Sequence, residues 1–355
     1  MALQTSKDPA DQPAGPAASR IGKNWKRNLI GILISVLCLG FIAWKINLAE
    51  LKNALATFQW TYLIWGVLSL AVGYTMRIVR WSSMLRAAGA QVSVAACVAP
   101  FLGSIAMNNT LPMRVGDVMR ALVFPSAIGV GKTTATGSLV MERLVDLMTL
   151  LACLMIGLAL SPRAHLPEWL AATSVTLALT GGITLALVFL FSGRLARLFA
   201  GLAARPKTDQ TSGSGKIYKT LGELLASFNA MSRLPVLLSL SGLSVFVWVG
   251  EAGLFWALLR GFGLDAGPET AIVVMAIATL STLVPSSPGY VGPFHLAAYA
   301  AISMLGGTPG QAASFAIVSH LAVWLPTTLA GAVAILLNPQ LFGGVKAKAA
   351  TLKSL

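Results

Sequence analysis

NNTLPMRVGDVMR, residues 108–120, decides the fold because it places a proline, a glycine and three charged side chains between two apolar runs. AACVAPFLGSIAM precedes this stretch and ALVFPSAIGV follows it. Polar, broken backbone at membrane depth is tolerated only where protein or a water-filled cavity surrounds it. The sequence therefore predicts that this stretch is the tip of a re-entrant helical hairpin at about residues 93–128.

Composition indicates that the solvent of most of this chain is a lipid bilayer. Of its 355 residues, 56% are hydrophobic and 11% are charged, against about 25% charged in an average soluble protein. The apolar runs are long and unbroken, which excludes the alternating strands of a membrane barrel. We expect an all-α polytopic integral membrane protein with six full spans, at residues 28–46, 61–85, 132–160, 169–192, 235–259 and 311–337.

A second interrupted apolar segment lies in the C-terminal half. TLVPSSPGYVGPFH, residues 282–295, breaks the apolar stretch 267–306. Basic residues gather in the tail, after the second span, between the fourth and fifth spans, and at the end of the chain. The positive-inside rule places all four clusters in the cytoplasm only if both interrupted segments are hairpins that return to the face they left. Hairpins entering from opposite faces predict an inverted repeat with a central binding site.

The excess of basic residues does not indicate a nucleic acid partner. There are 26 Lys and Arg against 12 Asp and Glu, but the basic clusters lie beside membrane spans, so no nucleic acid partner is expected. Residues 1–27 are predicted to be a disordered cytoplasmic tail, 28–337 a single transmembrane domain, and 338–355 a second cytoplasmic tail. The three cysteines lie in apolar runs without CxxC spacing, so no metal or other cofactor is expected.

Charged residues in the third span are the first site candidates. Glu142, Arg143 and Asp146 lie within MERLVD, and each charge facing lipid at the helix centre would cost about 2.5 to 3.5 kcal/mol. We expect them to face the interior, either as a functional site or as a structural ion pair. Arg77 and Arg80 end the second span, where we expect them to extend to lipid phosphates.

The two breaks supply the other candidates. At the first break, backbone groups without helical partners and the neighbouring arginines suit an anionic headgroup. In the alternative, Asp117 only caps the following half-helix while Arg114 pairs with Glu142 or Asp146. At the second, hydroxyls and exposed backbone are available, and His295 and His320 are either structural or proton carriers. The predicted substrate-binding residues are Asn108, Pro112, Arg114, Gly116, Asp117, Arg120, Glu142, Arg143, Asp146, Ser286, Ser287, Pro288, Gly289, Gly292 and His295.

Four motifs occur in an order and spacing that resemble a known family. They are RW at residues 80–81, NNTLPMRVGDVMR, ERLVD at 142–146, and PSSPGYVGPFH at 285–295. Together they resemble the flippase-like family typified by the transmembrane domain of lysylphosphatidylglycerol synthases, from the first span to the sixth. The resemblance implies movement of a phospholipid or lipid-linked headgroup between leaflets of a bacterial or archaeal cytoplasmic membrane. Many members carry glutamate where this chain has His295, and no synthase domain is expected after residue 338.

The leading hypothesis is a lipid flippase or scramblase, with no enzymatic activity of its own. The alternative is a membrane-embedded lipid-modifying transferase, or an accessory subunit of a synthase or transferase; a purely structural scaffold is a third reading. The longest extramembrane connection, residues 193–234, is too short for a nucleotide-binding domain. Phospholipids, polyprenyl phosphates and glycolipids all fit a phosphate-binding site, and the sequence leaves the direction of transport, the energy source and the oligomeric state open.

Overall fold

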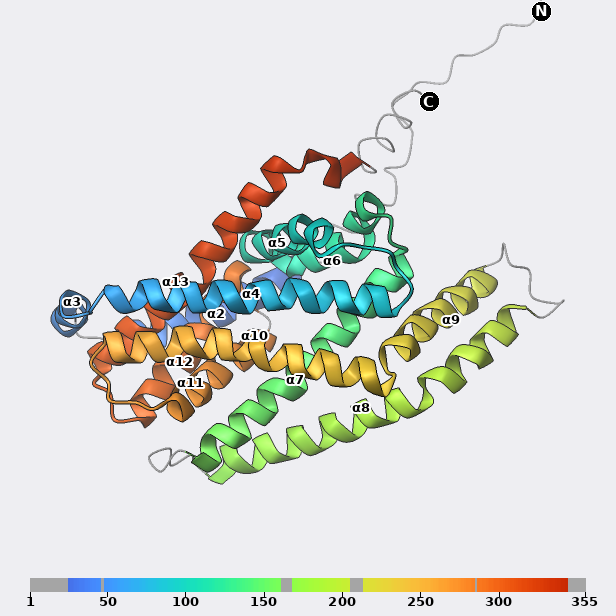
Figure 1. Cartoon of the computed structure of the whole chain (residues 1–355). Helices are drawn as coiled ribbons and strands as arrows, with labels where there is room; N and C mark the ends of the chain where they lie inside the picture. The colour runs from blue at the N-terminus through green and yellow to red at the C-terminus, as the bar shows by residue number, and fades with distance from the viewer. Residues whose placement is uncertain (1–24, 46–47, 161–167, 205–212, 285, 344–355) are drawn as a thin grey trace, which may run out of the picture.

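The computed structural model describes residues 25–45, 48–160, 168–204, 213–284 and 286–343, and it is helical with no strand in these ranges. Figure 1 shows the α-helices, which are α2 (Trp25–Lys45), α3 (Leu48–Ala56), α4 (Thr61–Ala87), α5 (Val94–Thr110), α6 (Val115–Leu122), α7 (Lys132–Leu160), α8 (Glu168–Ala203), α9 (Gly213–Met231), α10 (Leu234–Gly261), α11 (Pro268–Leu280), α12 (Pro293–Met304) and α13 (Pro309–Leu337). Short 3-10 turns are η2 (Pro112–Arg114), η3 (Phe124–Ile128), η4 (Ser281–Leu283), η5 (Pro288–Tyr290) and η6 (Pro339–Phe342). The all-helical class is therefore confirmed.

Four described helices are long and apolar enough to cross a membrane: α4, α7, α10 and α13. They coincide with four of the six predicted spans, and the bounds of α7 are those predicted. A fifth crossing is added if α2 and α3, which meet at 88°, count as one bent span. The predicted span at 169–192 falls in α8, which continues to Ala203. Most of both predicted tails, residues 1–24 and 344–355, lies outside the described residues, and α2 already begins at Trp25.

Local sequence explains where several helices begin. Ser93 starts α5 by accepting a hydrogen bond from the Ala96 N–H at 3.1 Å. Thr308 starts α13 through a reciprocal capping box: its hydroxyl accepts from the Gln311 N–H, and the Gln311 side-chain oxygen accepts from the Thr308 N–H. Both caps satisfy backbone donors that the first helical turn leaves free.

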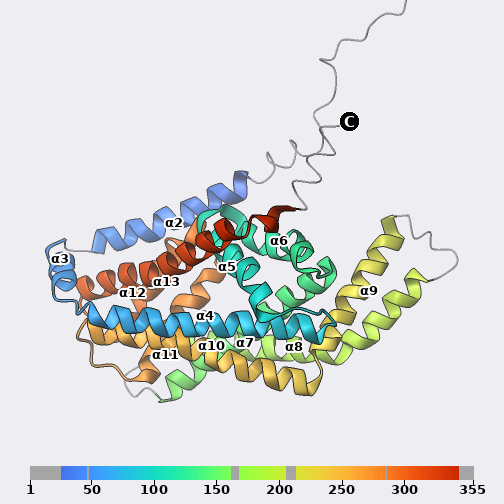
Figure 2. The ribbon, with the colours of Figure 1, turned by 45° about the horizontal axis from the view of Figure 1, so that its top comes forward.

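Helices α4 and α10 run side by side in the body of the protein (Figures 1 and 2). Their backbones approach at Gly73 and Gly250, where a Cβ added to Gly250 would lie 2.6 Å from the Gly73 Cα. The Ser69 hydroxyl donates to the Gly250 carbonyl oxygen at 2.9 Å across the same contact. Small residues and hydroxyls of this kind are typical of helix pairs in membranes, where close backbone approach replaces the hydrophobic driving force.

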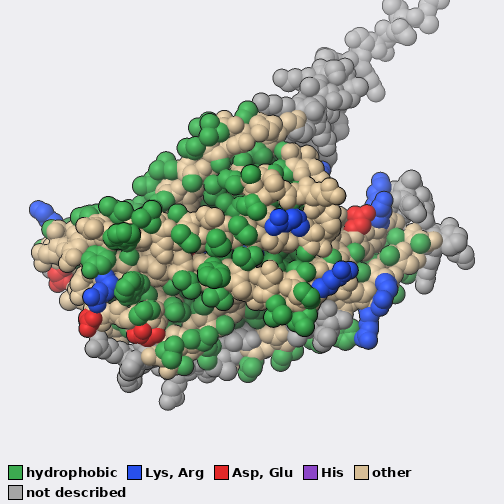
Figure 3. Space-filling view, viewed as in Figure 1, with side chains coloured by type: hydrophobic (Ala, Val, Ile, Leu, Met, Phe, Trp, Pro, Cys, Tyr) green, Lys and Arg blue, Asp and Glu red, His purple; other side chains and the backbone are tan. Residues whose placement is uncertain are grey.

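The outer surface is apolar, as lipid contact requires. On α4, Ile64, Trp65, Leu68 and Val72 are each more than half exposed, and hydrophobic side chains cover much of the face in Figure 3. The buried core lies in the interior, between α4 and the helices α10 to α13. It includes Phe255, Phe294 and Phe315. The chain is therefore a multi-pass membrane protein whose interior must also hold any buried charge.

Both predicted breaks are present, but they differ in form. The first separates α5 from α6 at Leu111 to Arg114, and α6 has only 8 residues. The second runs from Ser281 to Gly292, between α11 and α12. Among the described residues, positive φ at a non-glycine position occurs only at Met113, Arg114 and Tyr290, all within the two breaks. Such backbone is costly and persists where surrounding structure holds it, most often at functional sites.

Candidate functional site

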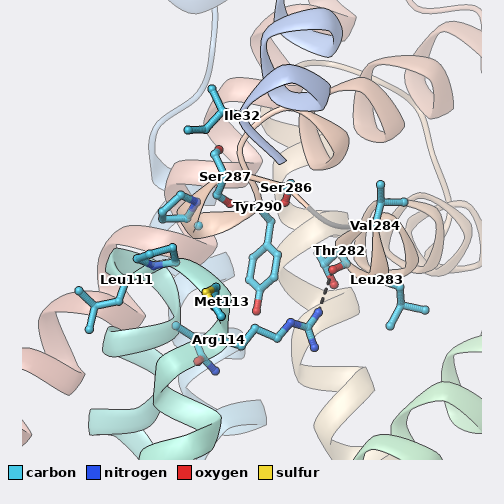
Figure 4. Close-up of a pocket in the computed structure, with 14 residues that line it drawn as sticks. Ile32, Leu111, Met113, Arg114, Thr282, Leu283, Val284, Ser286, Ser287 and Tyr290 are labelled. Carbon is cyan, nitrogen blue, oxygen red and sulfur yellow. Dashed lines mark hydrogen bonds between the residues drawn. The ribbon is translucent and has the colours of Figure 1, made fainter. Parts of the chain in front are cut away.

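The two breaks meet through the side chain of Arg114. Its Nη2 donates a hydrogen bond to the Thr282 carbonyl oxygen at 2.8 Å, and its guanidinium carbon lies 5.4 Å from the centre of the Tyr290 ring. Figure 4 shows Arg114 reaching from the first break, past Tyr290, to Thr282 in the second. The segments that were paired in the sequence on hydropathy and charge are thus in direct contact.

Two cavities adjoin this contact. The first, which we call the break cavity, has a volume of about 520 Å³ and is lined mainly by the two breaks, with Ile32 of α2 at its edge. The second, the inner cavity, has a volume of about 310 Å³ and lies among α4, α7, α10 and α13. Their shared lining is Asn108, Arg114, Thr282, Leu283, Gly289 and Tyr290. Arg114 therefore stands in the wall between the two cavities.

The first break is held in shape by Asn108 and Asp117. Asn108 Nδ2 donates to Asp117 Oδ1 at 2.8 Å, and Asn108 Oδ1 accepts from the Asp117 N–H at 3.1 Å. Gly116 brings α6 against α5, because a Cβ at this position would overlap the Ser104 carbonyl oxygen. The alternative in which Asp117 only caps the half-helix is wrong: α6 has no side-chain cap, and Asp117 binds Arg143. Its second part is also wrong, since Arg114 bonds to the Thr282 carbonyl rather than to Glu142 or Asp146.

Charged residues of α7 face the interior, as predicted. Glu142 and Asp146 are 3% and 7% exposed. Glu142 Oε1 lies 2.9 Å from Nη2 of Arg120, and Arg143 Nη2 contacts both Asp117 oxygens at 2.9 and 2.8 Å. Each of these two pairs joins α7 to α6. The ion-pair reading of this trio therefore has direct geometric support.

Arg77 and Arg80 do not extend to lipid phosphates, so that expectation is wrong. Arg80 is fully buried, with Nη2 at 2.7 Å from Asp146 Oδ1 and Nη1 donating to the Ser244 hydroxyl at 2.7 Å. Arg77 lies 2.7 Å from Glu251 Oε2 and 3.6 Å from Asp146 Oδ2. Carboxylates on α7 and α10 draw both guanidinium groups inwards, because an acid buried in this protein needs a partner of opposite charge.

The buried charges almost cancel. All four of the acidic residues in the cluster lie within 4.0 Å of an arginine, and they are Asp117, Glu142, Asp146 and Glu251. Five arginines face them, and they are Arg77, Arg80, Arg114, Arg120 and Arg143. Within the described part of the chain, Arg114 alone among these arginines has no carboxylate within that distance. With every group ionised, five arginines against four acids leave the cluster with one net positive charge.

The second break is fixed by hydroxyl and imidazole groups. Ser35 of α2 donates to the Val291 carbonyl oxygen at 2.6 Å and accepts from the Ser287 N–H at 3.0 Å. His320 Nε2 donates to the Gly289 carbonyl oxygen at 2.7 Å. The His295 ring lies 4.5 Å from that of His320, and its Nδ1 accepts from the Gly292 N–H at 3.5 Å.

The predicted site residues divide into two groups by position. Asn108, Pro112, Arg114, Arg143, Asp146, Ser286, Ser287, Pro288 and Gly289 line one or both cavities. The other six line neither: Gly116 packs on Ser104 of α5, Asp117 and Arg120 of α6 pair with Arg143 and Glu142 of α7, and His295 Nδ1 accepts from the Gly292 N–H. Sequence reasoning missed the aromatic lining of the inner cavity, chiefly Tyr74, Trp248, Tyr290 and Trp324. Tyr290 lies inside a motif already singled out, whereas the other three stand in ordinary apolar runs without a distinguishing pattern. Among the described residues, no three His, Cys, Asp or Glu side chains gather as metal ligands would.

A glycine substitution tests the contact that supports the second break. Gly289 has φ of 72°, and an added Cβ would lie 2.8 Å from Trp324 Nε1 and 3.1 Å from the Asn109 carbonyl oxygen. We expect Gly289→Ala to lose about 1–2 kcal/mol of stability to backbone strain and about 1–3 kcal/mol more to overpacking. Gly263→Ala is the matched control, with φ of 70° and no atom within 4 Å of the added Cβ. Unfolding in mixed detergent and SDS would measure both; equal losses would show that the Trp324 contact contributes nothing.

Comparisons with known proteins agree with this architecture. The family model described as the lysylphosphatidylglycerol synthase TM region matches residues 28–331, which confirms the resemblance drawn from the motifs. The chain is also similar to Glycosyltransferase AglD of Haloferax volcanii, with 22% identity over 340 residues that cover 87% of this chain and 54% of that protein. The chain thus spans about half the length of this curated relative. No solved structure matches the chain.

Proposed function

We propose that this chain, which belongs to the lysylphosphatidylglycerol synthase transmembrane family, is a lipid transporter, either a flippase or a scramblase. It moves a phosphate-bearing lipid or lipid-linked headgroup between the leaflets of a bacterial or archaeal cytoplasmic membrane. Its own chemistry is binding and passage, without an enzymatic step. The observation that carries the proposal is the position of Arg114, an arginine without a carboxylate partner, in the wall between two cavities of a membrane protein.

The proposed path follows from that position. The break cavity is bounded by Ile32, which lies on a helix with mostly exposed apolar side chains, and offers hydroxyls at Ser286 and Ser287. A headgroup entering here meets the Arg114 guanidinium while its acyl chains stay beside α2 in lipid. Movement of either break would open the wall toward the inner cavity, and the left-handed backbone at Met113, Arg114 and Tyr290 makes the breaks the segments suited to change conformation.

The proposed topology has six spans and two re-entrant hairpins that form an inverted repeat, with both termini in the cytoplasm. Support comes from the two broken segments, each a pair of short helices around a proline and glycine break. Their tips touch in the interior, which is the arrangement expected of hairpins that enter from opposite faces. α2 and α8 supply the two spans beyond the four clear ones.

A transfer assay tests the proposal. Purified protein is placed in phosphatidylcholine vesicles with a trace of fluorescent phosphatidylglycerol, and a membrane-impermeant reductant bleaches the outer leaflet. We expect wild type to expose inner-leaflet probe to bleaching, with or without an imposed pH gradient, and Arg114→Gln to slow this about tenfold or more. Glutamine keeps a donor for the Thr282 carbonyl but removes the charge, and hydrogen bonds to charged groups contribute about 1.5–3 kcal/mol.

Arg260→Gln is the matched control for this assay. Arg260 is a half-exposed arginine whose partner, Asp265, has 86% of its side chain exposed, and neither residue lines a cavity of the site. Its transfer rate should equal that of wild type. The proposal is wrong if wild type transfers no more probe than empty vesicles, or if Arg114→Gln transfers as fast as wild type.

A second candidate is an accessory role beside a transferase that acts on the same lipid. The Haloferax volcanii relative, which is named as a glycosyltransferase and of which the match covers 54%, favours it. Copurification of this chain with a transferase, and a chemically altered lipid product in mass spectra only when both are present, would support this candidate over transport alone.

A further inference from the structure

The inner cavity has features that select the charge of the headgroup, an inference that rests on the proposed function. Its volume of about 310 Å³ is at the lower end of the range of about 300–1,000 Å³ typical of ligand sites. This space suits a headgroup and not the chains of a lipid. The charge and polarity of the lining then determine which headgroup can bind.

A cationic headgroup finds no carboxylate to bind. Asp146 is held by Arg77 and Arg80, and both Glu251 oxygens are engaged, one by Arg77 and the other by the Thr279 hydroxyl at 3.1 Å. These are the acidic residues that line the inner cavity. Breaking one of these pairs to bind a ligand would leave a buried arginine without its partner, which costs more than the new contact returns.

Three of the four aromatic rings named above in the inner-cavity lining already lie against an arginine. The Arg77 guanidinium lies 4.5 Å from the centre of the Trp248 ring and 5.5 Å from that of Tyr74. Arg114 occupies the corresponding position over Tyr290 at 5.4 Å. An ammonium group gains from an aromatic face only when it can sit on that face, so these arginines compete with it for the Tyr74, Trp248 and Tyr290 rings.

An anion, by contrast, finds open donors and a favourable charge. Arg114 lacks a carboxylate within 4.0 Å in the described ranges, and the Arg143 side chain is 40% exposed and lines the inner cavity. One net positive charge is neutralised by one negative charge, and a buried site is most stable when its charges cancel. The remaining polar lining holds no carboxylate and includes Asn108, Asn109, Thr279, Thr282, Thr327 and His320.

We propose that the substrate headgroup is a phosphodiester with a single negative charge whose alcohol is uncharged and bears hydroxyl groups, such as glycerol, inositol or a sugar. The phosphate lies between Arg114 and Arg143, and the alcohol lies against the amide and threonine hydroxyls. Headgroups that add an ammonium to the same phosphate, as ethanolamine, choline and lysylglycerol do, are rejected.

Native mass spectrometry of the purified protein tests this selection. The probes are phosphatidylglycerol, phosphatidylinositol, phosphatidylethanolamine, phosphatidylcholine and lysylphosphatidylglycerol, offered as an equimolar mixture with identical acyl chains. We expect the first two to exceed the other three by about tenfold or more in the first bound lipid. The ratio of inositol to glycerol lipid then shows whether a ring or a linear alcohol fits better, and either supports the proposal.

Two variants separate the cavity from the general attraction of a basic protein for anionic lipid. Arg114→Gln should bind all five lipids at similar low levels, whereas Arg260→Gln should keep the wild-type preference. Equal binding of an ammonium-bearing lipid by wild type, or an unchanged preference in Arg114→Gln, would overturn the proposal. Selective binding without transfer in vesicles would leave this inference standing and reject the transport proposal, whereas Arg114-dependent transfer of lysylphosphatidylglycerol would do the reverse.

Discussion

Arg120→Met is expected to destabilise the protein by about 3–5 kcal/mol, more than removal of any surface charge. Arg120 is 1% exposed and its guanidinium lies 4.6 Å from the Phe101 ring and 5.3 Å from the Trp81 ring. Its partner Glu142 is 3% exposed, and Glu142 Oε2 has no hydrogen-bond partner in the described structure. Without Arg120, the carboxylate would remain buried with its nearest counter-charge gone.

The double variant Arg120→Met/Glu142→Leu shows whether the charge or the shape is responsible. Replacing both members of a buried ion pair with apolar residues of similar volume is often neutral for stability, so we expect most of the loss to be recovered. Arg260→Met removes an exposed ion pair and should change stability by less than about 1 kcal/mol. Unfolding in mixed detergent and SDS compares all three. A double variant as unstable as Arg120→Met would show that packing of the arginine against Phe101 of α5 and Trp81 of α4, and not its charge pairing with α7, provides its stabilisation.

Gly116→Ala is the second large effect, with an expected loss of about 3–5 kcal/mol from overpacking and from the hydrogen bonds that the first break would lose. The new Cβ would overlap the Ser104 carbonyl oxygen and lie 2.8 Å from Asn108 Oδ1. Backbone cannot rotate away as a side chain can, so α6 must move off α5. That shift separates Asn108 from Asp117 and moves Arg114 relative to Thr282, so lipid transfer should fall together with stability.

Gly242→Ala is the control for the chemical change itself. Gly242 is exposed in the middle of α10, with nothing within 4 Å of an added Cβ. Alanine is favoured over glycine in a helix by about 1 kcal/mol, so this variant should be as stable as wild type or slightly more so. Stability and transfer are measured on both variants in parallel. Equal behaviour of Gly116→Ala and Gly242→Ala would show that the close contact between α5 and α6 is not needed.

Hydropathy and the positions of proline and glycine predicted much of the fold. The apolar run at 132–160 has the bounds of α7, since lipid solvation makes the composition of a long helix nearly sufficient to locate it. Proline and glycine located the two breaks, because Pro112 and Pro288 cannot continue the preceding helix and Gly289 adopts a left-handed backbone. The helices within the 193–234 connection were harder to predict. α8 continues into it as far as Ala203, and α9 begins at Gly213.

The site was predicted only in part because its pairings are long-range. Arg77 lies 174 residues from Glu251 along the chain, and its position near a helix end favoured contact with lipid phosphates. Only the folded arrangement of α4, α7 and α10 brings acid to base there. Glu142, Arg143 and Asp146 were found because a charge within an apolar run is anomalous in any fold. Trp248 and Trp324 carry no such anomaly, so their place on the inner cavity depends on packing that one sequence does not display.

The charge balance of the interior also bears on how such a protein can change over generations. Arg80, Arg120 and Arg143 each form an ion pair with a buried or half-buried carboxylate. A lineage that loses one of these arginines must therefore also alter its carboxylate partner or lose the fold. Arg114 has no carboxylate within 4.0 Å among the described residues, and its structural contacts are the Thr282 carbonyl oxygen and the Tyr290 ring. A lineage that loses Arg114 therefore gives up one hydrogen bond between the breaks and leaves no buried carboxylate of the cluster without its closest arginine.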